Sequence, residues 1–231
     1  MFRIIMKNTY VDIAQMIDHS LLKPNLSAID LEAGCRLALE YQVASVCVLP
    51  YYVLHAVRLL RGSPVLPTTT IGFPHGGQTT PVKLAEAQQA IDDGARELDM
   101  VVNISAVLSG EWGYVRNDIA SINFAAHYAG CKVKVIFENC YLNEQQKIKL
   151  CTICGELDVD WAKTSTGFGT GGATLTDVEL MRQQLPTRVQ VKAAGGIRDL
   201  ETVLQLRQRG VTRIGTSNTA AILDSCRGQA S

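Results

Sequence analysis

Apolar and polar positions along the chain follow two distinct patterns, one typical of strands and one typical of helices. Eight short, largely apolar runs are typical of buried β-strands, at residues 17–22, 44–49, 68–73, 97–103, 132–139, 160–165, 189–194 and 212–217. Stretches with the apolar spacing of amphipathic helices lie between them, for example 31–42, 82–94, 144–154 and 177–185. Such alternation predicts parallel strands joined by helical crossovers.

The length of the repeat favours a closed barrel over an open sheet. The 231 residues divide into eight units of about 29 residues, close to the roughly 31 residues per unit of a (β/α)8 barrel. No G-x-G-x-x-G follows the first strand, so an open dinucleotide-binding sheet loses its main support. We therefore expect an α/β fold with a single TIM-barrel domain over residues 1–231. Segment 9–17 is expected to form a short N-terminal helix that caps the barrel floor.

Composition limits the class of protein. Lys and Arg number 22, as do Asp and Glu, so the net charge is zero. Without a basic surplus we expect no nucleic-acid partner. No run of roughly 20 apolar residues and no signal peptide is evident, which predicts a cytoplasmic protein without a membrane partner. The seven cysteines include one C-x-x-C, at 151–154 in a helical stretch. Reduced thiols are the simplest interpretation, and a redox or metal role for this pair stays open.

Charged residues interrupt three predicted strands with a period of two. The polar faces comprise Glu97, Asp99 and Asn103; Lys132, Lys134 and Glu138; and Gln190 and Lys192. If the apolar faces meet the helices, these side chains point into the barrel, where charges are costly unless paired or used. A structural ion network is one interpretation. We favour catalysis, because active sites of this fold lie at the carboxyl ends of the strands.

Two lysines end neighbouring predicted strands, Lys163 in the sixth and Lys192 in the seventh. Two adjacent ammonium groups repel, and we expect each to lower the pKa of the other. A neutral lysine attacks carbonyl carbon and forms a Schiff base, with Asp99 as a candidate general base. This reasoning leaves open which of the two lysines is the nucleophile.

Glycines and a serine follow the last three predicted strands. They are Gly167, Gly195, Gly196 and Ser217. In this fold the loops after strands seven and eight commonly bind phosphate through backbone N–H groups and a helix N-terminus. Each cluster by itself could be a simple turn. Their shared position favours a phosphorylated substrate.

The chain resembles the deoxyribose-phosphate aldolase family of class I aldolases, from residue 17 to residue 218. The resemblance rests on these motifs, in this order: IDHSLLKP, ASVCVLP, TIGFPHGG, ELDMVVNI, KVIFE, KTSTGFGTGGAT and KAAGGIRD. It implies reversible cleavage of 2-deoxy-D-ribose 5-phosphate to D-glyceraldehyde 3-phosphate and acetaldehyde through a lysine Schiff base, in deoxynucleoside catabolism. It also implies a homodimer that needs no metal and no cofactor.

The resemblance assigns a role to each matching residue. Lys163 would be the Schiff-base nucleophile, and Asp99 and Lys192 would be proton donors and acceptors. Asp18 and Lys134 would support the substrate hydroxyls and the proton relay. The phosphate would be held by Gly167, Gly195, Gly196 and Ser217. Asn218 departs from the family pattern, which usually has a second small residue at this position.

Two other functions stay open on the sequence. One is a different lysine-dependent aldolase or a transaldolase that acts on a phosphorylated sugar. The other is a catalytically silent barrel that binds a ligand, although the joint presence of Asp99, Lys163 and Lys192 argues against it. His19 is either a residue that orients the site or a structural histidine. Cys47 and His75 are expected to be barrel and loop filler.

Overall fold

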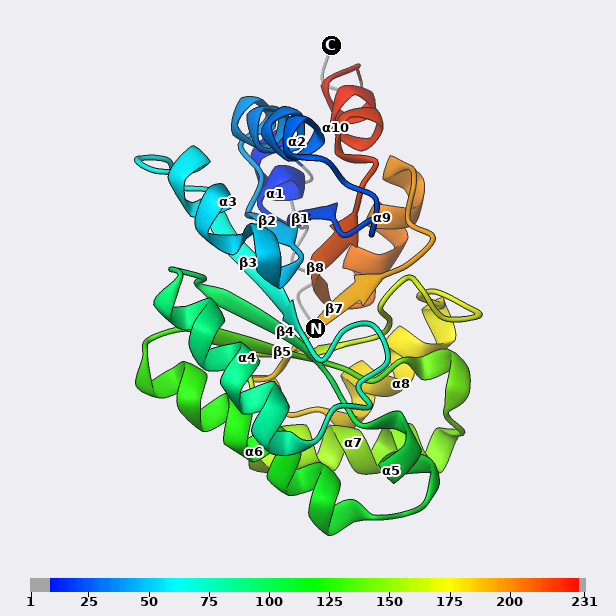
Figure 1. Ribbon diagram of the computed structural model, residues 1–231. Coiled ribbons are helices and arrows are strands. Elements are labelled where there is room, and N and C mark those ends of the chain that lie inside the picture. Colours follow the sequence, from blue (N-terminus) through cyan, green and yellow to red (C-terminus); the bar gives the residue numbers. More distant parts are fainter. Residues whose placement is uncertain (1–8, 229–231) are drawn as a thin grey trace.

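The computed structural model describes residues 9–228 and contains a closed barrel of eight parallel strands (Figure 1). Each strand pairs with the next, and β8 pairs with β1 to close the ring. The predicted TIM barrel is thereby confirmed. The strands are β1 (Ile17–Leu21), β2 (Ser45–Val48), β3 (Leu66–Ile71), β4 (Glu97–Val101), β5 (Lys132–Ile136), β6 (Trp161–Lys163), β7 (Gln190–Ala194) and β8 (Val211–Thr216).

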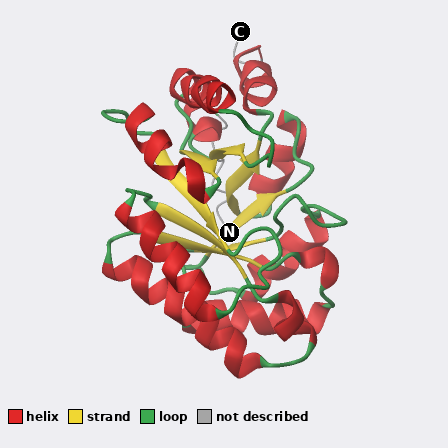
Figure 2. Ribbon diagram, viewed as in Figure 1, coloured by secondary structure: helices red, strands yellow, loops and turns green. Residues whose placement is uncertain are grey.

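Helices alternate with the strands and surround the barrel on its outside (Figure 2). None of those within residues 9–228 is long and apolar enough to span a bilayer. They are α1 (Tyr10–Ala14), α2 (Ala28–Tyr41), α3 (Val53–Leu59), α4 (Thr80–Asp92), α5 (Ile104–Leu108), α6 (Trp112–Tyr128), α7 (Glu144–Glu156), α8 (Leu175–Gln184), α9 (Leu200–Gln208) and α10 (Thr219–Gly228), with short 3₁₀ turns η1 (Pro50–Tyr52) and η2 (Asn139–Tyr141).

A short helix does form before the first strand. Helix α1 packs against α10, and its residues Ile13 and Ala14 are buried. That this helix caps the floor of the barrel stays a prediction.

Local side-chain hydrogen bonds explain where several helices begin. At the start of α2, the Ser27 hydroxyl accepts from the Asp30 backbone N–H at 3.2 Å, and the Asp30 carboxylate accepts from the Ser27 N–H at 2.9 Å. Asn143 and Gln146 form the same reciprocal pair at the start of α7. These capping boxes satisfy backbone donors that the first helical turn leaves without partners.

The strands place apolar and charged side chains on opposite sides of the barrel wall. In β4 and just after it, Leu98, Met100 and Val102 belong to the apolar core that also includes residues of the surrounding helices. Glu97 and Asp99 point the other way and contact charged residues of other strands inside the barrel. The predicted period of two is therefore confirmed for β4.

Two polar residues of the fifth predicted strand lie at or beyond the ends of β5. Lys132 is exposed at the beginning of β5, where its ammonium lies 5.3 Å from the centre of the Trp161 ring. Lys134 and Arg213 lie near the same ring, so Lys132 is on the side of the barrel wall that the period of two predicts. Glu138 follows the end of β5, and its buried carboxylate accepts hydrogen bonds from the backbone and hydroxyl of Thr166.

A second ion pair is buried in the helical layer, where α4 packs against α6. Lys83 Nζ lies 2.6 Å from Asp118 Oδ2 and donates to the Val101 carbonyl oxygen at 2.9 Å, and neither charged side chain is accessible to solvent. Thr80 donates a further hydrogen bond to Asp118. Each charge of the pair is thus fully compensated inside the protein.

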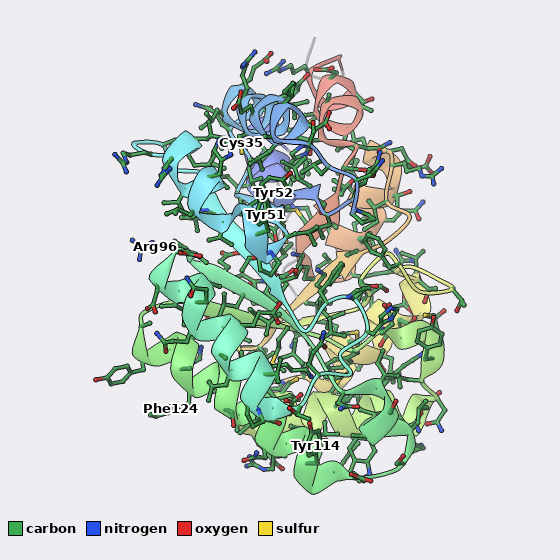
Figure 3. All side chains as sticks on the ribbon, viewed as in Figure 1. Cys35, Tyr51, Tyr52, Arg96, Tyr114 and Phe124 are labelled. Carbon is green, nitrogen blue, oxygen red and sulfur yellow. The ribbon has the colours of Figure 1, made fainter. Side chains whose placement is uncertain are left out.

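The outer face of helix α6 is open to solvent. Phe124 on this face is 74% exposed (Figure 3).

We predict that Lys83→Met lowers the free energy of unfolding by about 3–5 kcal/mol, because it leaves the Asp118 carboxylate buried without its cation. The double variant Lys83→Met/Asp118→Leu should recover most of this loss. Urea unfolding of the three proteins measures the effect. Equal stability of the two variants would show that the buried carboxylate is not the source of the cost.

Candidate active site

Seven charged side chains from six strands meet inside the barrel, and we call them the buried ion cluster. Its carboxylates come from β1 and β4, and its cations come from β5, β6, β7 and β8. All seven residues are 9% exposed or less. The members are Asp18, Glu97, Asp99, Lys134, Lys163, Lys192 and Arg213.

Asp99 lies at the centre of the buried ion cluster. Its Oδ2 atom accepts from Lys163 Nζ at 2.7 Å and from Lys192 Nζ at 2.7 Å. Its Oδ1 atom accepts from Lys134 Nζ at 2.9 Å. A single carboxylate oxygen therefore joins the two lysines that the sequence singled out.

Arg213 and Glu97 occupy the other side of the cluster. Arg213 donates to Asp18 Oδ1 at 2.6 Å and to the two oxygens of Glu97 at 3.1 and 3.2 Å. Glu97 also pairs with Lys134. Arg213 was not among the residues expected from the sequence. Its signal was a charged residue inside a strand that is predicted to be buried.

The cluster contains four cations and three carboxylates, so its charges do not balance if every group is ionised. Burial lowers the pKa of Lys163; Asp99 opposes the shift and Lys192 adds to it. Burial acts in the same direction on Lys134 and Lys192, but several carboxylates outweigh it, and the pKa of each is raised. The imbalance therefore falls on Lys163, which has one carboxylate partner.

The structure corrects one expectation about the two lysines. The sequence predicted that Lys163 and Lys192 lower each other's pKa, and this is wrong for Lys192. Its ammonium contacts Asp18 as well as Asp99, and two carboxylates outweigh one neighbouring cation. Asp18 and Asp99 remain ionised: burial raises the pKa of each carboxyl, but the neighbouring cations outweigh it and lower both strongly.

A cavity of about 650 Å³ opens above the cluster. Among the members of the buried ion cluster, all within the described residues 9–228, Lys163 is the one that lines this cavity. Asp18 and Lys134 lie fully buried beneath it. Their position fits a proton relay better than direct contact with a substrate. A ligand in the cavity reaches the amine of Lys163 first.

The four residues expected to hold phosphate meet in one wall of the cavity, namely Gly167, Gly195, Gly196 and Ser217. The backbone requires glycine here: Gly195 has φ +86°, and a Cβ on Gly172 would lie 2.2 Å from the Gly195 carbonyl oxygen. The wall ends at the N-terminus of α10, a position that favours anions. The backbone N–H of Asn218, next to Ser217, donates a hydrogen bond within the protein, to Thr216 Oγ1 at 2.9 Å.

Two cationic residues of the cavity were overlooked in the sequence. Lys23 follows β1 and Arg198 follows β7, and both line the cavity. Arg198 stands in the motif KAAGGIRD, directly after the glycine pair, which is the signal that could have identified it. Both cations lie on the rim of a site that could bind an anion.

The lesser candidates separate into one cavity residue and two others. His19 lines the cavity, and its Nδ1 lies 2.8 Å from Thr219 Oγ1 at the start of α10. Cys47 is buried in β2, and burial, with Asp99 adding, raises the pKa of its thiol to about 12. His75 is exposed in the loop after β3. The cavity lining includes neither Cys47 nor His75, in agreement with the filler interpretation.

A family model described as DeoC/LacD family aldolase matches residues 13–221. The chain belongs to this aldolase family. A deoxyribose-phosphate aldolase of Rhodopirellula baltica is 59% identical over 95% of this chain and 91% of its own length. Another, of Thermococcus gammatolerans, is 47% identical over 94% of this chain and 97% of its own length.

Solved structures agree with this assignment. The deoxyribose phosphate aldolase of Aeropyrum pernix, described as a unique tetramer, superposes with a TM-score of 0.89 at 30% identity and covers 96% of this chain and 94% of its own. The protein is therefore an aldolase, a lyase that acts on carbon–carbon bonds. The homodimer that the resemblance implies stays a prediction.

We predict that His19 stays neutral in the folded aldolase down to about pH 4, because burial lowers its pKa from the ordinary value of 6.5 to about 4. The unfolded chain takes up this proton near pH 6.5. Protons then favour unfolding between these two values, and the free energy of unfolding falls as the pH drops through the window. NMR titration of the His19 imidazole and urea unfolding at several pH values measure both effects.

His19→Gln should flatten that pH dependence by up to one proton, because glutamine does not titrate. His55→Gln, which removes a surface imidazole, is the matched control. An imidazole at position 19 that titrates near pH 6.5 in the folded protein would contradict the prediction.

Proposed function

We propose that this aldolase cleaves 2-deoxy-D-ribose 5-phosphate reversibly to D-glyceraldehyde 3-phosphate and acetaldehyde, with Lys163 as the Schiff-base nucleophile. The proposal rests on the position of Lys163. This residue lines the cavity, and its ammonium group is the positive charge that the carboxylates of the cluster do not balance. The choice of substrate is supported by the relatives, which are named deoxyribose-phosphate aldolases. The same chemistry would serve in the breakdown of deoxynucleosides.

Imine formation is the first step in the direction of cleavage. The neutral amine of Lys163 attacks C1 of the open-chain sugar, and loss of water gives an iminium ion. The proton that leaves the nitrogen has a short route, because Asp99 Oδ2 lies 2.7 Å from both Lys163 and Lys192. Asp99 and Lys192 thus serve as proton acceptor and donor, with Asp18 and Lys134 fixing their positions.

Charge balance then favours cleavage of the carbon–carbon bond. The iminium restores a fourth positive charge to a cluster with three carboxylates. When the C3 hydroxyl loses its proton and the C2–C3 bond breaks, the bonding electrons neutralise the iminium nitrogen and leave an enamine. Protonation of the enamine carbon and hydrolysis release acetaldehyde and regenerate Lys163. A buried site with excess positive charge stabilises each neutral form relative to its cation.

The phosphate group of the substrate is proposed to bind at the glycine wall. Gly167 after β6 and the pair Gly195 and Gly196 after β7 would supply backbone donors, and Ser217 would supply a hydroxyl close to the start of α10. Lys23 and Arg198 add positive charge at the same cavity. Binding at this end places the carbonyl carbon of the sugar toward Lys163.

Trapping with acetaldehyde and borohydride tests the nucleophile. We expect a stable ethyl adduct on Lys163, found by intact mass and peptide mapping, and its loss in Lys163→Ala. Lys83 is an internal control, since it is equally buried but paired with Asp118 outside the cavity. Release of acetaldehyde from deoxyribose 5-phosphate, compared with transfer of a dihydroxyacetone unit, separates the proposed substrate from a transaldolase reaction. A folded protein that forms no adduct would indicate a silent barrel.

A second prediction concerns the phosphate. Arg198→Met should raise KM for deoxyribose 5-phosphate about 10-fold or more, because a charge-assisted hydrogen bond to an anion is lost. Cleavage of unphosphorylated deoxyribose should change much less. Arg188→Met, at an exposed arginine paired with Asp158, is the matched control. Equal losses on both sugars would show that Arg198 does not act on the phosphate.

A further inference from the structure

Two members of the buried ion cluster have no role in the reaction described above, and both lie on the side remote from the cavity. Arg213 and Glu97 contact each other through two nitrogen–oxygen pairs at 3.1 and 3.2 Å. Neither lines the cavity, so neither touches a substrate bound there. Buried charges are nevertheless costly to retain, which raises the question of what they do.

We propose that Arg213 and Glu97 are positioning residues that set, through the charge count of the cluster, how much of Lys163 is in its neutral, reactive form: Arg213 favours the neutral amine and Glu97 opposes it. This proposal rests on the proposed function of Lys163 as the nucleophile. Arg213 supplies the cation in excess of the number of carboxylates, and Glu97 limits that excess to one charge. The two residues act on Lys163 through the groups between them.

The contacts provide a continuous path from Arg213 to Lys163. Arg213 holds Asp18 Oδ1 at 2.6 Å, and Asp18 Oδ2 pairs with Lys192. Lys192 and Lys163 then share Asp99 Oδ2, each at 2.7 Å. Because Arg213 occupies Asp18 and Glu97, these carboxylates are less free to stabilise the lysines. Asp99 contacts three ammonium groups, and it is the carboxylate partner of Lys163.

Solvent has little access to this part of the barrel, so it screens the charges weakly. Trp161 is 4% exposed, and its ring lies 4.9 Å from the guanidinium carbon of Arg213 and 5.7 Å from Lys134 Nζ. Buried charges interact at a much lower effective dielectric constant than exposed ones, and salt screens them less. A change of one charge at Arg213 or Glu97 is therefore felt at Lys163.

Seven charged or titratable groups around Lys163 come from six other strands. They are Cys47 on β2, Asp99 and Glu97 on β4, Lys134 on β5, Lys192 on β7, Asp18 on β1 and Arg213 on β8. Cys47 stays a neutral thiol, because burial raises its pKa to about 12. Neighbouring charges outweigh burial to lower the pKa of Asp18 and Asp99 and to raise the pKa of Lys134, Lys192 and Arg213, so these five keep their charges near neutral pH. Lys163, whose pKa burial lowers, is the member that adjusts.

The two residues have effects of opposite sign. Without Arg213, three lysines face three carboxylates, so the cluster is balanced with Lys163 protonated and imine formation needs a higher pH. Without Glu97, two carboxylates face four cations, so protonation of Lys163 becomes harder and imine formation extends to a lower pH. A merely structural ion pair would not produce shifts in opposite directions.

The test is the pH profile of imine trapping on the full-length protein, with acetaldehyde and a borohydride reductant, read as the rate of ethylation of Lys163. Relative to the unsubstituted protein, Arg213→Met should move the midpoint up by about one pH unit, and Glu97→Gln should move it down by a similar amount. The charge-neutral double variant Glu97→Gln/Arg213→Met should return close to the original midpoint. Arg213→Lys, which keeps the charge, should also stay close to it.

Arg209→Met and Glu179→Gln are the matched controls, since this ion pair is exposed and 2.7 Å apart, and neither should shift the midpoint. Unchanged midpoints in both cluster variants, or shifts in the same direction, would overturn the inference. If Arg213→Met does not fold, the sign of the Glu97→Gln shift decides the matter. Absence of any adduct on Lys163 in the unsubstituted protein would refute the proposed function itself.

Discussion

Bulk water has little access to the interior of a closed barrel, so a charge placed there is costly unless an opposite charge compensates it. This constraint shapes the functional centre of the protein. Three carboxylates and four cations share the space, joined by contacts of 3.4 Å or less around Asp99 and Asp18. One cation is left over. It is the lysine with a single carboxylate partner and access to the cavity, and its amine is the group best suited to attack a carbonyl carbon.

The second buried ion pair shows what a purely structural solution looks like. Lys83 and Asp118 are as deeply buried as the cluster, but their charges are equal and opposite, and neither residue lines the cavity that Lys163 lines. The cation is satisfied by a carboxylate and a backbone carbonyl group. Burial alone therefore does not mark a catalytic lysine. The combination of burial, an excess of positive charge and an opening toward a ligand distinguishes Lys163.

The strands and the glycine-rich loops have different roles in the site. The strands fix the lysines and carboxylates within hydrogen-bonding distance, because neighbouring strands are locked in register around the ring. The loops after β6 and β7 approach each other closely where glycine removes the side chain, as at Gly172 and Gly195. The first arrangement suits proton transfer over short distances. The second leaves backbone donors facing the cavity, which suits an anionic group.

The sequence by itself determined the barrel, the charged inner face of β4 and the glycine-rich loops, because these depend on local spacing along the chain. It also identified Lys163, Lys192 and Asp99 as a group, with a family resemblance to rank them. The direction in which the pKa of Lys192 shifts was predicted wrongly from the sequence, and Arg213 was not identified. Only the tertiary structure decided which lysine lines the cavity and which carboxylates each cation contacts. Arg213, the cation that Asp18 and Glu97 share, is 195 residues from Asp18 and 116 from Glu97 in the chain, and the charge balance of a buried space depends on all the groups that fold into it.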